Sequence, residues 1–264
     1  MQSNLYIYSG LGNIIAIIDS IRDDILVESK DVVNLNLNQN VNFDQLIVVL
    51  PPENHENDFD VKIYNNDGSI ALNCINGARC VAKFIEDQSL SAFKKLKVNT
   101  EGGIWHLEAL SEDKFSASFS FSNDIKNISF GEGGQIIELD CISLGNPHAV
   151  TFEDQDSKLD FLRIGEDLQG SEKFPDGVNF GLASKVSENE IDLRVYERGA
   201  GETLACGSGA CAAAVIAKTK KQMRTPVKVN FQLGSLLIDY KKESNLINSW
   251  NLFLYQILIK LPLF

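Results

Sequence analysis

The chain has little positive charge, no long apolar run and few cysteines. Lys and Arg number 24 against 36 Asp and Glu, giving a formal net charge of −12, which argues against nucleic acid or an anionic membrane as the main partner. No apolar run reaches the roughly 20 residues needed to span a bilayer. The start, MQSNLYIYSG, lacks the basic and apolar regions of a signal peptide. We therefore expect a cytoplasmic globular protein with no nucleic acid and no membrane partner.

The cysteines fit neither a disulfide scaffold nor a common metal site. Their number, five, is odd and small for this length, so reduced thiols are expected. Cys74 and Cys80 are separated by five residues, and Cys206 and Cys211 by four; neither is a zinc spacing. A C-x-x-C redox motif is absent as well. We expect no metal site, and we interpret Cys80, Cys141 and Cys211 as core residues.

The sequence repeats itself. The segment IYNNDGSIALNCINGA (Ile63–Ala78) aligns without a gap with VYERGAGETLACGSGA (Val195–Ala210), and Cys74 and Cys206 are 132 residues apart. The segment GLGN that ends at Asn13 resembles SLGN ending at Asn146. Matches in the same order at nearly the same offset indicate two copies of one domain.

Each copy is expected to have short strands, then a cysteine-containing turn and a helix, then further strands. Strands are predicted over runs such as QLIVVL, VVNLNLN and IDLRVY, and helices from Gly77 to about Asp87 and over Ala210–Lys218. The second helix is apolar all round, which indicates burial inside its own sheet. FGEGGQ (Phe130–Gln135) is the best candidate for a linker.

Cys74 and Cys206 are each expected at the start of a buried helix. There the helix dipole and unpaired backbone N–H groups favour an anion, so they lower a thiol pKa or hold a carboxylate. Two such thiols facing one cleft could invert an α-carbon, because one removes the hydrogen while the other delivers a proton. The alternative is that both cysteines are small buried hydrophobic residues, and equivalence in a duplicated domain argues against it.

Seven segments resemble signatures of the diaminopimelate epimerase family: SGLGN, FDQLIVVLPP, YNNDGS, CINGARC, GNPHAV, FPDGVNFG and ERGAGETLACGSGAC. The resemblance implies interconversion of LL- and meso-diaminopimelate without pyridoxal phosphate, metal or any other cofactor. It also implies an α+β fold of two pseudo-symmetric domains, each a mostly antiparallel curved sheet around a central buried helix. We place these domains at residues 1–125 and 126–248, with an atypical apolar tail at 249–264 that could return to the first domain.

The resemblance also assigns roles to residues. Cys74 and Cys206 would be the two bases, and Arg198 would grip the distal carboxylate. His148 would either tune a cysteine or serve packing alone. The remaining expected substrate contacts are Asn13, Gln45, Asn65, Ile75, Asn76, Asn146, Asn179, Glu197, Gly207 and Ser208.

This chain departs from the family at Ile75, where the family has glycine, so a side chain there could crowd the carboxylate site or strain the turn. Its end, NLFLYQILIKLPLF, differs from the family's closing strand. Two alternatives stay open: a related proline or hydroxyproline racemase, and an impaired member that only binds an amino acid. A homodimer is also left open.

Overall fold

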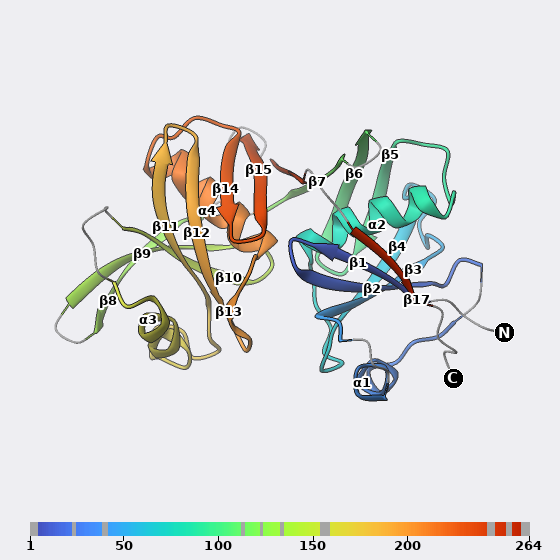
Figure 1. The fold of residues 1–264 in the computed structure, drawn as a ribbon, viewed down its shortest axis with the longest axis horizontal. Helices are drawn as coiled ribbons and strands as arrows, with labels where there is room; N and C mark the ends of the chain where they lie inside the picture. Colours follow the sequence, from blue (N-terminus) through green and yellow to red (C-terminus); the bar gives the residue numbers. More distant parts are fainter. Residues whose placement is uncertain are drawn as a thin grey trace. The chain divides into compact units, whose positions relative to one another are not determined.

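A computed structural model describes residues 5–22, 25–38, 42–111, 114–121, 124–132, 135–153, 159–241, 246–251 and 255–259 (Figure 1). The chain divides into two compact units. Unit 1 contains Met1–Phe119 and Trp250–Phe264, and unit 2 contains Ser120–Ser249. The sequence placed this division between residues 125 and 126.

Unit 1 is built from strands around one central helix, with a second helix outside. Its elements are β1 (Leu5–Gly10), β2 (Asn13–Asp19), α1 (Ser29–Asn38), β3 (Gln45–Leu50), β4 (Phe59–Asn65), α2 (Ile75–Asp87), β5 (Lys95–Thr100), β6 (Gly103–Ser111), β7 (Lys114–Ser120) and the late strand β17 (Tyr255–Ile259). β17 pairs antiparallel with β1, so Tyr255–Ile259 belongs to the same sheet as Leu5–Gly10.

The elements of unit 2 are β8 (Lys126–Glu132), β9 (Gln135–Ser143), β10 (Pro147–Glu153), α3 (Phe161–Leu168), β11 (Asn179–Ser187), β12 (Glu190–Glu197), β13 (Gly201–Thr203), α4 (Gly207–Lys220), β14 (Val227–Phe231) and β15 (Gly234–Lys241). From β9 onward unit 2 follows the element order of unit 1, with an additional strand, β8, before it and the short strand β13 inserted before its second helix. β16 (Leu246–Asn251) crosses the boundary between the two units.

The strand pairings repeat between the units. In unit 1, β2 pairs antiparallel with β1 and parallel with β3, β3 pairs antiparallel with β4, and β4 pairs parallel with β5. In unit 2, β10 pairs antiparallel with β9 and parallel with β11, β11 pairs antiparallel with β12, and β12 pairs parallel with β14. The helices α1 and α3 occupy equivalent connections. The structure confirms the predicted α+β fold of two like units, which the sequence repeat had indicated.

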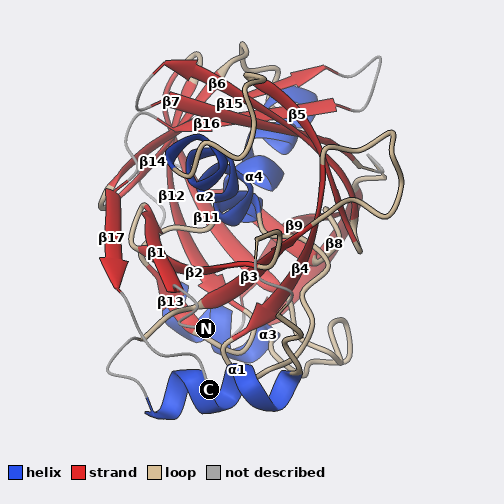
Figure 2. Ribbon diagram, turned by 90° about the vertical axis from the view of Figure 1, so that its right-hand side faces the viewer, coloured by secondary structure: helices blue, strands red, loops and turns tan. Residues whose placement is uncertain are grey.

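Each unit packs its strands around one helix, α2 in unit 1 and α4 in unit 2 (Figure 1). Figure 2 shows the helices in blue and the strands in red. α4 is buried from Gly209 to Ala217, consistent with its uniformly apolar sequence. α2 buries all of its first eight residues, including Arg79. No helix among the described residues is long and apolar enough to cross a membrane. The cytoplasmic location stays a prediction.

Two local expectations from the sequence are wrong. The run VVNLNLN, expected as a strand from its alternating pattern, lies in helix α1. Burial there follows the helical period, because Val32 and Leu35 are buried while Leu37 is 75% exposed. The expected linker FGEGGQ instead joins β8 and β9, which pair with Glu132 opposite Gln135. Gly133 and Gly134 lie outside the described residues.

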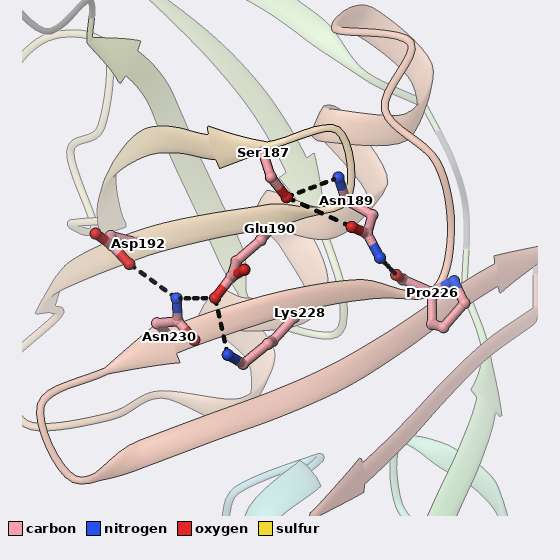
Figure 3. A network of polar contacts seen from close by, with 7 residues as sticks. All are labelled: Ser187, Asn189, Glu190, Asp192, Pro226, Lys228 and Asn230. Atoms are coloured by element: carbon pink, nitrogen blue, oxygen red, sulfur yellow. Dashed lines mark hydrogen bonds and ion pairs between the residues drawn. The ribbon is translucent and has the colours of Figure 1, made fainter.

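A network of side-chain hydrogen bonds on the surface connects the parallel strands β12 and β14 (Figure 3). Glu190 Oε1 accepts hydrogen bonds from Lys228 Nζ at 2.8 Å and Asn230 Nδ2 at 2.9 Å. The same Asn230 nitrogen donates to Asp192 Oδ1 at 2.9 Å. Hydrogen bonds from Lys228 and Asn230 lower the pKa of Glu190. These side chains are solvent-accessible, so the network specifies the strand register more than it stabilises the unit.

Candidate active site

The two cysteines have the same local geometry in the two units. Cys74 is the N-cap of α2, with φ −146° and ψ 101°, and Cys206 is the N-cap of α4, with φ −131° and ψ 116°. Cys74 Sγ accepts a hydrogen bond from the backbone of Gly77 at 3.1 Å, and Cys206 Sγ accepts one from Gly209 at 3.3 Å. Both side chains are buried. Each sulfur thus occupies the place of a capping oxygen, where a backbone N–H and the helix dipole stabilise a thiolate.

The loop before Cys74 is held by side chains from β5 and β6. Trp105 Nε1 donates to Asn73 Oδ1 at 2.8 Å, and Thr100 Oγ1 donates to the carbonyl of Leu72 at 3.3 Å. The Trp105 ring is 1% exposed. A buried ring therefore fixes the residue next to the cysteine, and the sulfur position follows from the core of unit 1.

The expected polar residues of unit 1 meet at one end of its strands. Asn13 begins β2 after a tight turn in which Leu11 and Gly12 have φ values of 56° and 84°. Asn76, in the first turn of α2, donates its Nδ2 to Asn13 Oδ1 at 3.5 Å. Gln45 Nε2, at the start of β3, donates to Asn65 Oδ1 at the end of β4 at 3.0 Å.

Ile75 follows Cys74 as the first residue of α2 and is 3% exposed. Its φ is not among the positive values of the described non-glycine residues, which are those of Leu11, Ser89 and Gln222. The isoleucine therefore causes no backbone strain of the kind that favours glycine. Its effect on a bound carboxylate stays a prediction.

In unit 2 a series of hydrogen bonds ends at the sulfur of Cys206. His148 Nε2 contacts Asn146 Oδ1 at 2.9 Å, Asn146 Nδ2 donates to Ser208 Oγ at 3.5 Å, and Ser208 Oγ lies 3.4 Å from Cys206 Sγ. An amide oxygen only accepts, so His148 carries its proton on Nε2. Burial, and then the charge of Arg198, lower the pKa of His148 to about 3. The imidazole is therefore neutral near pH 7, and any tuning of Cys206 passes through Asn146 and Ser208.

Cys206 has an acidic neighbour. Burial, followed by the charge of Glu197, raises the pKa of the Cys206 thiol well above its ordinary value, while hydrogen bonds from Ser208 and Gly209 lower it. Glu197 Oε1 also accepts a hydrogen bond from Thr203 Oγ1 at 2.6 Å. Free Cys206 is therefore protonated near neutral pH, which suits a proton donor.

Asn179 and Arg198 are joined through the backbone. Asn179 Oδ1 accepts from the Arg198 N–H at 3.0 Å, and Asn179 Nδ2 donates to the carbonyl of Pro147 at 3.1 Å. A Cβ at Gly177, whose φ is 76°, would lie 2.9 Å from Arg198 Cγ. The arginine stem thus packs on a turn that requires glycine.

Within each unit the expected residues come together. Unit 1 contains Asn13, Gln45, Asn65, Cys74, Ile75 and Asn76, and unit 2 contains Asn146, His148, Asn179, Glu197, Arg198, Cys206, Gly207 and Ser208. The strand registers make Gln45 equivalent to Asn179, because each pairs in parallel with the preceding strand. No group of three or more His, Cys, Asp or Glu side chains within the described ranges could hold a metal ion.

Four contributors were missed from the sequence: Asp44, Asn73, Arg79 and Thr203. Asp44 Oδ2 accepts from Asn13 Nδ2 at 2.9 Å and from the backbone of Ile14 at 2.7 Å. Arg79 is fully buried and donates to Asn76 Oδ1. The position of Arg79 within a mostly apolar helix was a usable signal, because an arginine is rarely buried without a partner.

Comparison with known proteins agrees with this arrangement. The family model described as diaminopimelate epimerase matches residues 5–119 and 141–249. Curated diaminopimelate epimerases from Stutzerimonas stutzeri and from Pseudomonas syringae pv. tomato are each 36% identical over 244 residues, which is 88% of this chain and 88% of theirs.

Solved structures share the fold at low identity. A phenazine biosynthesis protein of the PhzF family from Enterococcus faecalis matches with a TM-score of 0.69 and 13% identity over 97% of both chains. A hydroxyproline epimerase from Agrobacterium vitis matches with a TM-score of 0.66 and 12% identity, over 99% of this chain and 94% of that one. Such identities establish the fold alone, whereas the family model and the curated relatives establish the family. The chain belongs to the diaminopimelate epimerase family.

Proposed function

We propose that this protein is a cofactor-independent epimerase that interconverts LL- and meso-diaminopimelate by a two-base mechanism. The observation that carries the proposal is the pair of equivalent N-cap cysteines, Cys74 and Cys206, each with its sulfur on a backbone N–H of a buried helix. Membership of the family supports the substrate, since the curated relatives carry that name.

In the proposed reaction one sulfur, as thiolate, removes the α-hydrogen of the substrate, and the other sulfur, as thiol, delivers a proton to the opposite face. The electron pair left on the α-carbon is delocalised into the α-carboxylate until the new C–H bond forms. The reverse reaction exchanges the two roles, which suits two groups of the same chemistry. The mechanism requires both sulfurs to reach one carbon atom from opposite sides.

Substrate recognition is proposed to use neutral amides and helix N–H groups. The amides of Asn13, Gln45, Asn65, Asn76, Asn146 and Asn179 both donate and accept, so they hold a zwitterionic centre without adding net charge. The backbone N–H groups at Asn76, Gly207 and Ser208 suit the reacting carboxylate. Arg198 is proposed to bind the distal carboxylate with two parallel hydrogen bonds, and Glu197 to accept from the substrate.

The second candidate is a racemase for proline or hydroxyproline. It is favoured by the shared fold with the hydroxyproline epimerase from Agrobacterium vitis and with a probable proline racemase from Agrobacterium radiobacter, which matches with a TM-score of 0.67. Such substrates carry one carboxylate, so they leave Arg198 without a role. The charged pair Glu197 and Arg198 therefore favours diaminopimelate.

The test is incubation with LL-diaminopimelate in deuterated water. We expect solvent deuterium at one α-carbon together with the meso isomer. Removing a base should lower the rate of inversion at least about a thousandfold, so Cys74→Ala and Cys206→Ala should both be inactive. Cys141→Ala, which removes a thiol from β9, serves as the matched control and should retain activity.

Two outcomes would contradict the proposal. Undiminished turnover by Cys74→Ala would refute the two-base assignment. Racemisation of proline without turnover of diaminopimelate would assign the chain to the second candidate.

A further inference from the structure

A series of three hydrogen bonds crosses the polar end of unit 1, from helix α2 to the start of β3. Arg79 donates through Nη2 to Asn76 Oδ1. Asn76 Nδ2 donates to Asn13 Oδ1 at 3.5 Å, and Asn13 Nδ2 donates to Asp44 Oδ2 at 2.9 Å. Two amides that the sequence assigns to substrate contact thus lie between a cation and an anion.

The charged ends determine the direction of every bond in this series. A guanidinium can only donate, so it takes the oxygen of Asn76 and leaves the NH₂ group on the other side. An ionised carboxylate can only accept, so Asp44 takes the NH₂ group of Asn13 and leaves the oxygen toward Asn76. Both amides are therefore fixed in one of their two orientations.

We propose that Arg79 and Asp44 are positioning residues that orient the Asn13 and Asn76 amides for the substrate. This inference rests on the proposed epimerase function. Each NH₂ group has two hydrogens and uses one within the series, so one hydrogen of each amide remains for a substrate carboxylate. If either amide were reversed, an oxygen would face that carboxylate and the two groups would repel.

The surroundings restrict these groups further. Arg79 is 0% exposed, and a buried guanidinium keeps its charge and its donor-only character. A Cβ at Gly10 would lie 3.4 Å from Asn76 Cβ, so the β1–β2 turn packs closely on this amide. Asp44 Oδ2 also accepts from the backbone of Ile14 at 2.7 Å, which ties the carboxylate to the same strand as Asn13.

The equivalent position of unit 2 shows that the repeated scaffold does not impose this direction. There Asn146, equivalent to Asn13, donates to Ser208, equivalent to Asn76, at 3.5 Å. Donation therefore runs toward the helix in unit 2 and away from it in unit 1. Unit 2 has Cys211 where unit 1 has Arg79, consistent with the guanidinium setting the direction in unit 1.

The first test is steady-state kinetics of Asp44→Asn with diaminopimelate. An asparagine at position 44 keeps the size but can also donate, so Asn13 becomes free to reverse. We expect KM to rise roughly tenfold while kcat changes much less, because a ground-state contact to a carboxylate is lost. Asp58→Asn is the matched control, since the side chain of Asp58 accepts a backbone N–H outside this series, that of Lys97 at 2.7 Å. An equal KM for Asp44→Asn and Asp58→Asn would overturn the proposal.

A second pair of variants tests Arg79, at the other end of the series of hydrogen bonds. The lysine of Arg79→Lys is still a cation that can only donate, so this variant should retain part of the affinity. The glutamine of Arg79→Gln can also accept, so KM should rise roughly tenfold in this variant. Equal KM values for the two variants would overturn the role of Arg79. If neither variant folds, Asp44→Asn decides, because Asp44 is exposed.

A readout without substrate separates this inference from the proposed function. In the ¹⁵N-labelled wild-type chain, the side-chain NH₂ signals of Asn13 and Asn76 should each show one shifted, exchange-protected hydrogen, and Asp44→Asn should abolish this for Asn13. Unchanged signals would overturn the proposal. A wild-type chain that binds or turns over no diaminopimelate refutes the proposed function, while these signals still decide the amide orientation.

Discussion

The cysteine turns of the two units have one scaffold and different charges around them. In both units a cysteine caps the central helix and an asparagine begins or precedes the second strand of the repeat. Unit 1 adds a buried guanidinium, Arg79, beside this helix start, whereas unit 2 adds a carboxylate, Glu197, beside its sulfur. The repeat supplies two similar thiol positions, and the different residues around them make the positions chemically unequal.

The proposed reaction starts with one thiolate and one thiol. A nearby anion favours the neutral form of a thiol. Glu197 raises the pKa of Cys206 in this sense. The proposed role of Cys206 therefore depends on Glu197, a residue outside the repeated cysteine turn.

The largest contrast is expected from an added methyl group beside each sulfur. A Cβ at Gly77 would lie 2.5 Å from Ile47 Cδ1 and 2.9 Å from Cys74 Sγ, whereas at Gly209 the closest contact, Val195 Cγ2, is 3.2 Å away. We expect Gly77→Ala to destabilise by about 1–3 kcal/mol. Gly209→Ala should be near neutral, because a gain of up to about 1 kcal/mol in helix propensity offsets the tight contact. Urea unfolding would measure both, and equal midpoints would contradict the comparison.

A smaller contrast concerns the loops before the helices. Asn73→Ala leaves the N–H of buried Trp105 without its partner, which should cost about 1–2 kcal/mol. Thr203→Val removes a bond to half-buried Glu197, which water can replace, so the cost should stay below about 1 kcal/mol. Thermal unfolding of the two variants would rank them, and the reverse order would contradict this reasoning.

The smallest effect is a shift in the titration of Cys206. Glu197→Gln removes the carboxylate that raises the pKa of Cys206, so the thiolate should form at lower pH. Ultraviolet thiolate absorbance, corrected with Cys206→Ser, would follow it. Glu202→Gln, whose carboxylate pairs with Arg194 at 2.9 Å, is the control and should leave the titration unchanged. A shift to higher pH in Glu197→Gln would be the contrary result.

Much of this architecture was predictable because the repeat is visible in the sequence. The match around Cys74 and Cys206 located two equivalent helix starts, and the uniformly apolar Ala210–Lys218 indicated a buried helix. Each cysteine was followed by a glycine-containing turn, which a cap followed by a helix explains. These features are local in sequence, so pattern analysis can detect them.

The errors arose where local pattern and tertiary packing disagree. VVNLNLN alternates like a strand, but only Val32 and Leu35 contact the core, and a helix places these two on one side. The proposed roles of Arg79 and Asp44 depend on Asn76 and Asn13, which hydrogen-bond to each other although they are 63 residues apart in the chain. No local pattern encodes such contacts, so the direction of the amide bonds required coordinates.

The pairing of β17 with β1 has a consequence for biosynthesis. Leu5 lies opposite Ile259 in this pairing, so the first sheet is complete only after β17, which follows all the strands of unit 2 in the sequence, has left the ribosome. Unit 2 is continuous in sequence and has all its strands earlier, apart from β16 at its boundary. Because domains tend to fold as they emerge, the half that is translated first is expected to be completed last.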